Sequence, residues 1–341
     1  MSNILVFNVG SSSLKYAAYN LRLKERVRGE ADNFNKITNN ISKPKAIGHR
    51  IVHGGNKYIE PVILNAQILH DLDKLSDLAP LHNPPAVSVS RRSLKKWPDV
   101  PNVGVFDTSY YKDLPNFTKL YAIPFNLSQK YNIRRFGFHG TSHEYVAKKA
   151  AKKIGKTFET LKIITVHLGA GCSITAHKEG KAYDTSMGLT PLEGLIMARR
   201  CGDIDPGIIF YLRRVANLNF EELEEILNNK SGLLGISGVS KDIPDVVGCS
   251  TMEEPTEKSH RCGLALEMYA YRIKKYIGAY TAAMGGLDTL VFTGKVGEGS
   301  AIIRDMITNN LEFIGDFKTL VISTNEELQI AREVKRLVSS I

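Results

Sequence analysis

The chain has 341 residues, of which 43% are hydrophobic and 23% are charged, a composition typical of a folded soluble protein. This length exceeds what one hydrophobic core usually organises, so two domains are expected. The formal net charge of +10 suits a phosphate-bearing substrate, and equally a nucleic acid or an anionic membrane. The basic residues fall in short groups without interleaved aromatic residues, which favours a solvated surface and argues against a nucleic-acid partner.

The four cysteines, Cys172, Cys201, Cys249 and Cys262, form no CxxC pair and no short framework. Neither structural zinc nor a disulfide scaffold is therefore expected, and free thiols indicate a reducing compartment. No apolar run reaches membrane-spanning length, and no signal peptide is evident at the N-terminus. We therefore expect a cytoplasmic protein with no membrane partner.

Short β-rich runs alternate with helical patterns, which is typical of an α/β protein. Residues 4–8 and 14–19 are predicted to form a hairpin across a turn of glycine and serines. Residues 163–167 and 173–177 repeat this arrangement across a second glycine-bearing turn. The self-similarity suggests a duplicated domain.

A third strand is predicted at residues 289–293, followed by a turn at residues 294–297 and a helix from about Ser300. Apolar periodicity predicts helices over residues 143–154, 220–227, 264–284 and 326–338.

The two glycine-bearing turns have the small residues that let backbone N–H groups approach a phosphate, and Lys15 adds a charge after the first of them. A plain hairpin turn explains the glycines equally well. Gly294 and Lys295 do not form a Walker A loop, because Val296 stands where Ser or Thr is needed to hold magnesium.

Two pairs of histidines stand four residues apart, His49 with His53 and His139 with His143. Such spacing on a helix can hold a metal, but neither pair has the HExxH arrangement, so a metallohydrolase is disfavoured. Ser142 is predicted to be the N-cap of the helix that follows it.

The segment at residues 199–206 places two adjacent guanidiniums beside Asp203 and Asp205. It is either a salt-bridged turn or a loop that delivers Arg200 to a phosphoryl group, with the neighbouring carboxylates holding the arginine.

Seven segments together resemble the acetate kinase family in order and type, and the resemblance extends from residue 3 to about residue 335. They are NVGSSSLK (8–15), HRIVHGG (49–55), LAPLHNPP (78–85), FDT (106–108), FGFHGTSH (136–143), DTSMGLTPLEG (184–194) and TNEE (324–327).

The resemblance implies a duplicated actin-like, ribonuclease H-like α/β kinase fold of two domains with a central cleft, assembled as a homodimer. The N-terminal domain would span residues 1–115, with the C-terminal helix at 328–341 packing back on it. The C-terminal domain, residues 116–327, would hold the nucleotide and the dimer interface.

The resemblance also implies roles for individual residues. Asn8 and Glu326 match the family's magnesium residues, with Mn²⁺ as an alternative metal. Arg50 matches the carboxylate-binding arginine, and the pocket for the acetate methyl matches Val52, Leu81, Phe138 and Pro191. The catalytic residues match Asp107, His139 and Arg200.

The family labels Asp107 an active-site acid or base. Acetate is ionised near neutral pH and needs no base, so we expect Asp107 mainly to organise Arg50 or a metal-bound water. Nucleotide binding is predicted for Lys15, His167, Leu168, Gly169, Ala170, Gly171, Asp242, Ile243, Pro244, Lys295, Val296, Gly297, Glu298 and Gly299.

The departures from the family pattern cluster on the nucleotide side. Ala170 and Gly299 stand where the family usually has Asn, Pro244 where it has Arg, and Lys295 where it has Gly. Arg199 and Cys201 replace smaller or more polar neighbours of Arg200, and the chain is shorter than its family between residues 28 and 45 and between residues 313 and 318. The sequence therefore indicates the class of reaction more clearly than it indicates the phosphoryl donor.

The predicted function is that of an acetate kinase: reversible Mg²⁺-dependent transfer from ATP to acetate, giving acetyl phosphate and ADP. One alternative is a carboxylate kinase with another donor, such as pyrophosphate, or a longer acid, propionate or butyrate. A second alternative is a non-catalytic protein that binds acyl phosphate or nucleic acid. The complete set of transfer residues argues against this alternative, because a protein that only binds its ligand needs no residues that stabilise a transition state.

Overall fold

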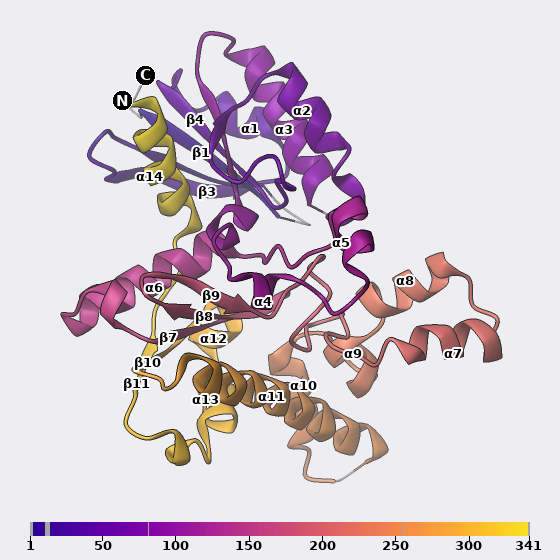
Figure 1. The fold of residues 1–341 in the computed structure, drawn as a ribbon. Helices are drawn as coiled ribbons and strands as arrows, with labels where there is room; N and C mark the ends of the chain where they lie inside the picture. Colours follow the sequence, from indigo (N-terminus) through magenta and orange to yellow (C-terminus); the bar gives the residue numbers. More distant parts are fainter. Residues whose placement is uncertain (1–2, 11–13, 81, 255, 340–341) are drawn as a thin grey trace. The chain divides into compact units, whose positions relative to one another are not determined.

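A computed structural model describes residues 3–10, 14–80, 82–254 and 256–339 (Figure 1). These residues form two compact units. Unit 1 is drawn from Met1–Asp113, Ala122–Tyr145 and Thr324–Ile341, and unit 2 from Leu114–Tyr121 and Val146–Ser323. The boundary between residues 115 and 116 stays a prediction.

The sheet of unit 1 has the strand order β3-β2-β1-β4-β6-β5. Strand β1 pairs antiparallel with β2, which pairs antiparallel with β3, whereas β1, β4 and β6 run parallel. The predicted first hairpin is confirmed, with Asn8 opposite Lys15. The strands are β1 (Ile4–Val9), β2 (Leu14–Tyr19), β3 (Glu25–Ala31), β4 (Ala46–Ile51), β5 (Val62–Ile63) and β6 (Asn102–Phe106).

The sheet of unit 2 repeats this topology except for β5, which pairs antiparallel with β6 in unit 1 alone among the described residues; its order is β9-β8-β7-β10-β11. Strand β7 pairs antiparallel with β8, and β8 with β9, while β7, β10 and β11 run parallel. The predicted duplication is therefore confirmed at the level of strand order and direction. The strands are β7 (Ile163–Leu168), β8 (Cys172–Lys178), β9 (Lys181–Thr185), β10 (Thr289–Thr293) and β11 (Lys318–Val321).

Strand β1 is buried throughout, and apolar except for Asn8, because helices cover both faces of its sheet (Figure 1). Leu5 and Phe7 point into a core shared with α1 (Phe34–Thr38), α2 (Ala66–Asp73) and α3 (Asn83–Lys96). Ile4 and Val6 point to the opposite face, where they meet Ile330 and Val334 of α14 (Glu326–Val338). The alternation follows the two-residue period of a strand.

The predicted helices are confirmed, with longer bounds at several ends. They are α6 (Gly140–Ile154), α8 (Phe220–Asn229), α11 (Glu257–Met284) and α14 (Glu326–Val338). The other helices are α4 (Asn116–Lys119), α5 (Phe125–Tyr131), α7 (Gly207–Val215), α9 (Gly232–Ser237), α10 (Ile243–Ser250), α12 (Gly294–Gly299) and α13 (Ala301–Thr308), with 3₁₀ turns at Ser76–Leu78, Asp107–Tyr111, Phe158–Thr160 and Glu312–Ile314.

Two expectations about local structure are wrong. Helix α6 begins at Gly140, so Ser142 lies in its first turn instead of capping it, and the Ser142 hydroxyl donates to Thr324 Oγ1 at 2.8 Å. The segment after β10 is helical from Gly294, where a turn was expected.

Among the described helices, none combines the length and apolarity needed to span a bilayer.

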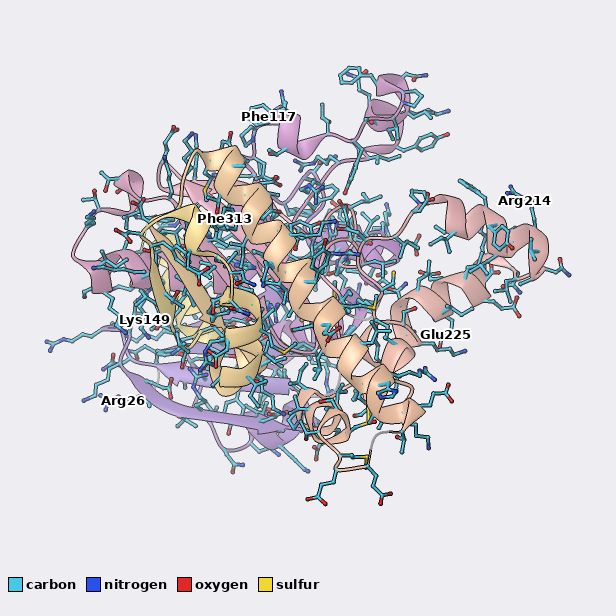
Figure 2. The ribbon with its side chains drawn as sticks, turned by 90° about the horizontal axis from the view of Figure 1, so that it is seen from below. Arg26, Phe117, Lys149, Arg214, Glu225 and Phe313 are labelled. Carbon is cyan, nitrogen blue, oxygen red and sulfur yellow. A yellow bond between two sulfur atoms is a disulfide. The ribbon has the colours of Figure 1, made fainter. Side chains whose placement is uncertain are left out.

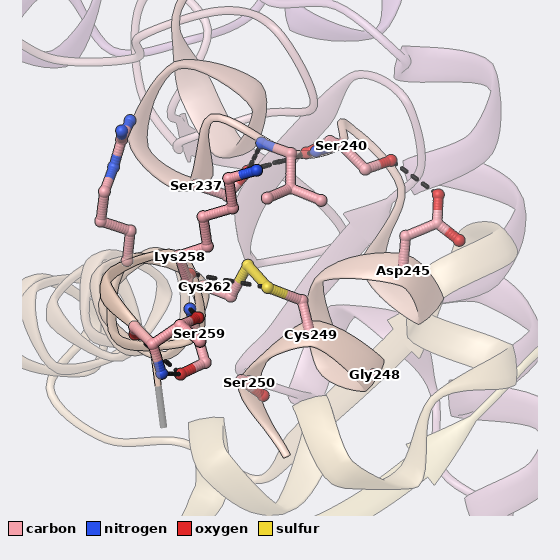
Figure 3. Close-up of a disulfide and its surroundings, with 12 residues drawn as sticks. Ser237, Ser240, Asp245, Gly248, Cys249, Ser250, Lys258, Ser259 and Cys262 are labelled. Atoms are coloured by element: carbon pink, nitrogen blue, oxygen red, sulfur yellow. Dashed lines mark hydrogen bonds between the residues drawn. A yellow bond between two sulfur atoms is a disulfide. The ribbon is translucent and has the colours of Figure 1, made fainter. Parts of the chain in front are cut away.

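The expectation of four free thiols is wrong for two of the cysteines. Cys249 of α10 and Cys262 of α11 form a disulfide, with their Cα atoms 6.0 Å apart (Figure 3). Cys172 and Cys201 are free. The disulfide links two packed helices of unit 2 across a separation of 13 residues, a spacing that has no sequence signature.

Because the disulfide restricts the unfolded chain across a separation of 13 residues, Cys249→Ser is expected to lower the free energy of unfolding by about 2–4 kcal/mol. The measurement is urea unfolding of both proteins with and without a dithiol reductant. Reductant should destabilise the wild-type protein and the control variant Cys201→Ser, and leave Cys249→Ser unchanged. A wild-type transition that does not respond to reductant would contradict this assignment.

Candidate active site

Polar side chains of unit 1 gather where its parallel strands end. Asn8 lies near the end of β1, Arg50 near the end of β4, and Asp107 directly after β6. Because these three strands are parallel, their carboxyl ends meet at one edge of the sheet. Glu326 and Glu327 join them from the first turn of α14, which begins there because Asn325 caps it by accepting from Leu328 N.

Arg50 and Asp107 form a bidentate ion pair. The Arg50 Nη2 donates to Asp107 Oδ2 at 2.6 Å, and Nε lies 3.1 and 3.2 Å from the two carboxylate oxygens. Asp107 is fully buried and also accepts from Thr141 Oγ1 at 2.8 Å. Burial alone would lower the pKa of Arg50, but the nearby carboxylates of Asp107 and Glu326 raise it above its ordinary value.

Asn8 connects the pair to α14. Its Nδ2 donates to Glu326 Oε2 and Glu327 Oε1, each at 2.8 Å, while its Oδ1 accepts from Arg50 Nη1 at 3.1 Å. The same Nη1 lies 3.3 Å from Glu326 Oε2, and Arg28 neutralises Glu327 from outside at 2.6 Å. The cluster therefore balances two arginines against three carboxylates.

The donor set of this cluster fits Mg²⁺. Asn8 Oδ1 and Glu326 Oε2 are hard oxygen ligands, and Mg²⁺ typically takes one or two carboxylates and keeps several waters. In the part of the chain that the structure describes, no cluster of three His, Cys, Asp or Glu forms a metal cage of its own. The histidine pairs form none either: His139 lies outside α6, and His49 is buried against Asn102 with its pKa lowered to about 4 by burial.

The segment with His139 packs closely against Asp107. Tyr111 donates to the carbonyl of Phe138 at 2.9 Å, and a Cβ on Gly140 would lie 2.0 Å from the backbone oxygen of Asp107. His139 has φ +55°, an unusual conformation for a residue other than glycine and one that tends to mark functional sites.

The predicted acetate-methyl pocket is described only in part. Phe138 and Val52 are buried in unit 1, Pro191 is a half-buried residue of unit 2, and Leu81 lies outside the described residues, as do the serines of the first glycine turn.

Arg200 of unit 2 is half-buried. Its Nη1 donates to the carbonyl of Pro191 at 3.4 Å and lies 3.7 Å from Met197 Sδ, and no described carboxylate pairs with it. Burial lowers its pKa. The expectation that neighbouring carboxylates hold this guanidinium is wrong, because Asp203 pairs with Arg272 instead.

A pocket of about 660 Å³ in unit 2 brings most of the predicted nucleotide residues together. Those that line it are Gly169, Ala170, Asp242, Ile243, Pro244, Lys295, Val296 and Gly299. The lining residues that the sequence did not indicate are Ala198, Leu233, Lys241, Val247, Tyr269, Ser300 and Ile302. Of these, Ala198, Lys241 and Ser300 directly adjoin a recognised segment, while Tyr269 comes from the middle of α11.

The remaining predicted nucleotide residues do not line the pocket. Lys15 is exposed on β2 of unit 1, and Leu168 is fully buried. Glu298 Oε1 accepts from Gly294 N at 3.0 Å and so supports the start of α12. His167, Gly171 and Gly297 also lie outside the lining.

The two sheets share three antiparallel strands followed by two parallel strands, and unit 1 adds β5, antiparallel to β6. This duplicated framework is the one expected of an actin-like phosphotransferase. Residues 27–319 match the model of the acetokinase family. An acetate kinase of Halothermothrix orenii is 41% identical over 401 aligned positions, which cover 99% of this chain and 100% of the relative.

Two solved structures are also similar. A propionate kinase from Francisella tularensis subsp. tularensis SCHU S4 has a TM-score of 0.90 at 36% identity, covering 98% of this chain and 100% of its own. The acetate kinase of Porphyromonas gingivalis has a TM-score of 0.87 at 34% identity, covering 99% and 100%.

The chain belongs to the acetokinase family. The predicted family, the duplicated actin-like fold and the kinase activity class are confirmed. The alignment with the Halothermothrix enzyme is longer than this chain, so that relative carries segments that are absent here.

Proposed function

We propose that the protein catalyses the reversible, Mg²⁺-dependent transfer of a phosphoryl group from ATP to acetate, giving acetyl phosphate and ADP. The observation that supports it most is the guanidinium of Arg200. A half-buried cation that no described carboxylate neutralises is stabilised by a bound anion, and a transferring phosphoryl group is such an anion.

Acetate is the proposed acceptor, as the names of the acetate kinase relatives suggest. Arg50 would bind its carboxylate. Of the five guanidinium N–H donors, those on Nε and Nη1 and one on Nη2 face Asp107, Asn8 and Glu326, which leaves one N–H of Nη2 without a described partner. Val52 and Phe138, with Leu81 and Pro191, would contact the methyl group.

Asp107 acts through Arg50. Its carboxylate is engaged by the guanidinium and by Thr141, so it holds Arg50 in one orientation, and acetate itself needs no deprotonation. Asn8 and Glu326 would hold Mg²⁺ or Mn²⁺, and the bound ion would neutralise charge on the phosphoryl oxygens. His139 and Arg200 would donate to the same oxygens as charge builds up in the transition state.

The donor pocket favours ATP over pyrophosphate. A volume of about 660 Å³ lies in the usual range for small-molecule sites. Ile243, Val247 and Ile302 give it an apolar wall that suits a nucleoside, whereas pyrophosphate would leave this wall uncovered. Lys295 and Lys241 line the same pocket, and they would meet phosphate oxygens there.

We also infer a homodimer. No residue of α7 is buried, although Phe210, Tyr211 and Val215 are large and apolar, and Phe220 of α8 is exposed as well. Figure 2 shows the side chains of these helices, with Arg214 and Glu225 labelled. A second copy of the chain would cover this apolar surface.

The use of ATP favours the cytoplasm as the place of the reaction.

The test is a hydroxylamine trap for acyl phosphate, run with acetate, propionate or butyrate against ATP, GTP or pyrophosphate. Hydroxamate should form fastest with acetate and ATP, and only when Mg²⁺ is present. Omitting the acid is the control. If no combination gave hydroxamate at saturating Mg²⁺, the chain would be a binding protein instead of an enzyme.

Arg200→Ala is expected to lower kcat by on the order of 10³-fold with little change in the KM for acetate, because a residue that meets only the transferring group stabilises the transition state. Arg50→Ala should raise the KM for acetate strongly. Arg50→Lys is the control for Arg50→Ala. It keeps a positive charge beside the buried Asp107 carboxylate but loses the bidentate hydrogen-bond geometry of arginine. Retention of more than about a tenth of kcat in Arg200→Ala would contradict the assigned role.

The variant Lys295→Gly tests whether this lysine helps ATP to bind, by pairing with a phosphate, or hinders it, by blocking the nucleoside. If Lys295 pairs with a phosphate, the KM for ATP should rise by up to about fivefold, since an exposed ion pair is worth up to about 1 kcal/mol. We expect this result. A lower KM for ATP, with any pyrophosphate reaction unchanged, would show instead that the lysine blocks the nucleoside.

A further inference from the structure

The loop at residues 194–203, which carries Arg200, is closed at its base by side chains that the reaction itself does not use. Asp203 N donates to the carbonyl of Gly194 at 2.9 Å, and Asp203 Oδ1 accepts from Gly194 N at 2.8 Å. The two ends of the loop are therefore joined by one backbone and one side-chain hydrogen bond.

Helix α11 holds this closure from outside the loop. Arg272 Nη1 donates to the carbonyls of Gly194 and Asp203 at 3.2 and 3.1 Å, and it lies 3.4 Å from Asp203 Oδ2. The Tyr276 hydroxyl donates to the same Oδ2 at 2.8 Å. Arg272 and Tyr276 stand four residues apart, so they share one face of the helix. We call Asp203, Arg272 and Tyr276 the α11 brace.

The position of the Arg200 guanidinium depends on the backbone of this loop. The described contacts of its side chain are the long ones to Pro191 and Met197, at 3.4 and 3.7 Å. Its carbonyl, by contrast, accepts from Met197 N at 3.1 Å within the loop. Gly194 has φ +105°, a conformation that side-chain-bearing residues rarely adopt, so the base of the loop is a sharp turn. Backbone hydrogen bonds hold the middle of the loop, such as those from Ser231 N to the carbonyl of Arg199 and from Cys201 N to the carbonyl of Leu227, while its two ends are held at Gly194 and Asp203.

We propose that the α11 brace consists of positioning residues for Arg200: by closing the loop, it keeps the guanidinium where the transferring phosphoryl group develops charge. The proposal rests on the role of Arg200 in the proposed function. Misplacement of a catalytic group by about 1 Å can cost up to about 100-fold in rate, so the brace affects kcat much more than it affects stability.

The residues of the α11 brace can be substituted without unfolding the protein, because they are partly exposed. The Asp203 and Arg272 side chains are 39% and 23% exposed and border a second cavity, of about 380 Å³. Exposed ion pairs contribute little to stability, and truncation here leaves no hole in the apolar core.

The experiment is a double-mutant cycle between Asp203→Ala and Arg200→Ala. Asp203→Ala should lower kcat by about 10- to 100-fold in the wild-type background, with the KM for ATP nearly unchanged. In the Arg200→Ala background it should cost no further activity, since there is no guanidinium left to position. An equal loss of kcat in both backgrounds, or no loss in either, would overturn the proposal.

Two further variants serve as controls. Asp203→Asn keeps an acceptor for Gly194 N and should recover part of kcat. Asp205→Ala removes a carboxylate two residues away, whose Oδ1 accepts from Gly207 N at 2.8 Å outside the brace, and it should keep wild-type kcat. A loss in Asp205→Ala as large as that in Asp203→Ala would count against the proposal.

Hydrogen exchange of the amides at residues 195–202 tests the brace independently of turnover. Faster exchange in Asp203→Ala than in Asp205→Ala is expected, and equal exchange in the two variants would overturn the proposal. If Arg200→Ala kept wild-type kcat, the proposed role of Arg200 would fail, and the exchange result would then decide whether the brace holds the loop.

Discussion

The Arg50–Asp107 ion pair organises the polar edge of unit 1. Transferring two charges out of water costs several kcal/mol each, and their attraction offsets this only when the geometry is good and other polar atoms are satisfied. Both conditions are met: the pair is bidentate, Thr141 binds Asp107, and Asn8 and Glu326 bind the other end of the guanidinium. Through this one ion pair, residues from β1, β4, the 3₁₀ turn after β6, α6 and α14 are held together.

The two arginines differ in how far the protein itself satisfies them. Arg50 is held by carboxylates and an amide, which raises its pKa and leaves little freedom to its side chain. Arg200 has only a distant carbonyl and a sulfur as described contacts, and burial lowers its pKa. A satisfied guanidinium is suited to hold a substrate in a fixed orientation. An unsatisfied one is suited to meet charge that appears only during the reaction.

The duplicated sheet explains why the candidate sites lie at strand ends. In each unit the parallel strands end at one edge, and the backbone turns there into loops and short helices. In unit 1 this edge carries Asn8, Arg50 and Asp107, and in unit 2 the turn after β7 and the helix after β10 line the pocket described above. One framework therefore supports a cluster of arginines and carboxylates in one copy and a pocket of about 660 Å³ in the other.

The amino-acid sequence determined the local structure and the family of this protein. Alternation and turn residues predicted both hairpins, and apolar periodicity predicted α8, α11 and α14, because these signals depend on neighbours within a few residues. The motifs indicated Arg50, Asp107 and Arg200, and they predicted that Asp107 organises Arg50 or a metal-bound water, but they did not indicate the other contacts of these residues.

Those contacts were decided by the tertiary structure, because they join residues far apart in the chain. Asn8 meets Glu326 across more than 300 positions, Cys249 pairs with Cys262 between two helices, and Tyr269 reaches the pocket from the middle of α11. The sequence favoured a carboxylate neighbour for Arg200. In the folded protein Asp203 pairs with Arg272 instead, and the Arg272 guanidinium also donates to the backbone carbonyls at the base of the loop. Spacing along the chain cannot indicate that choice, because it depends on which helix packs beside the loop.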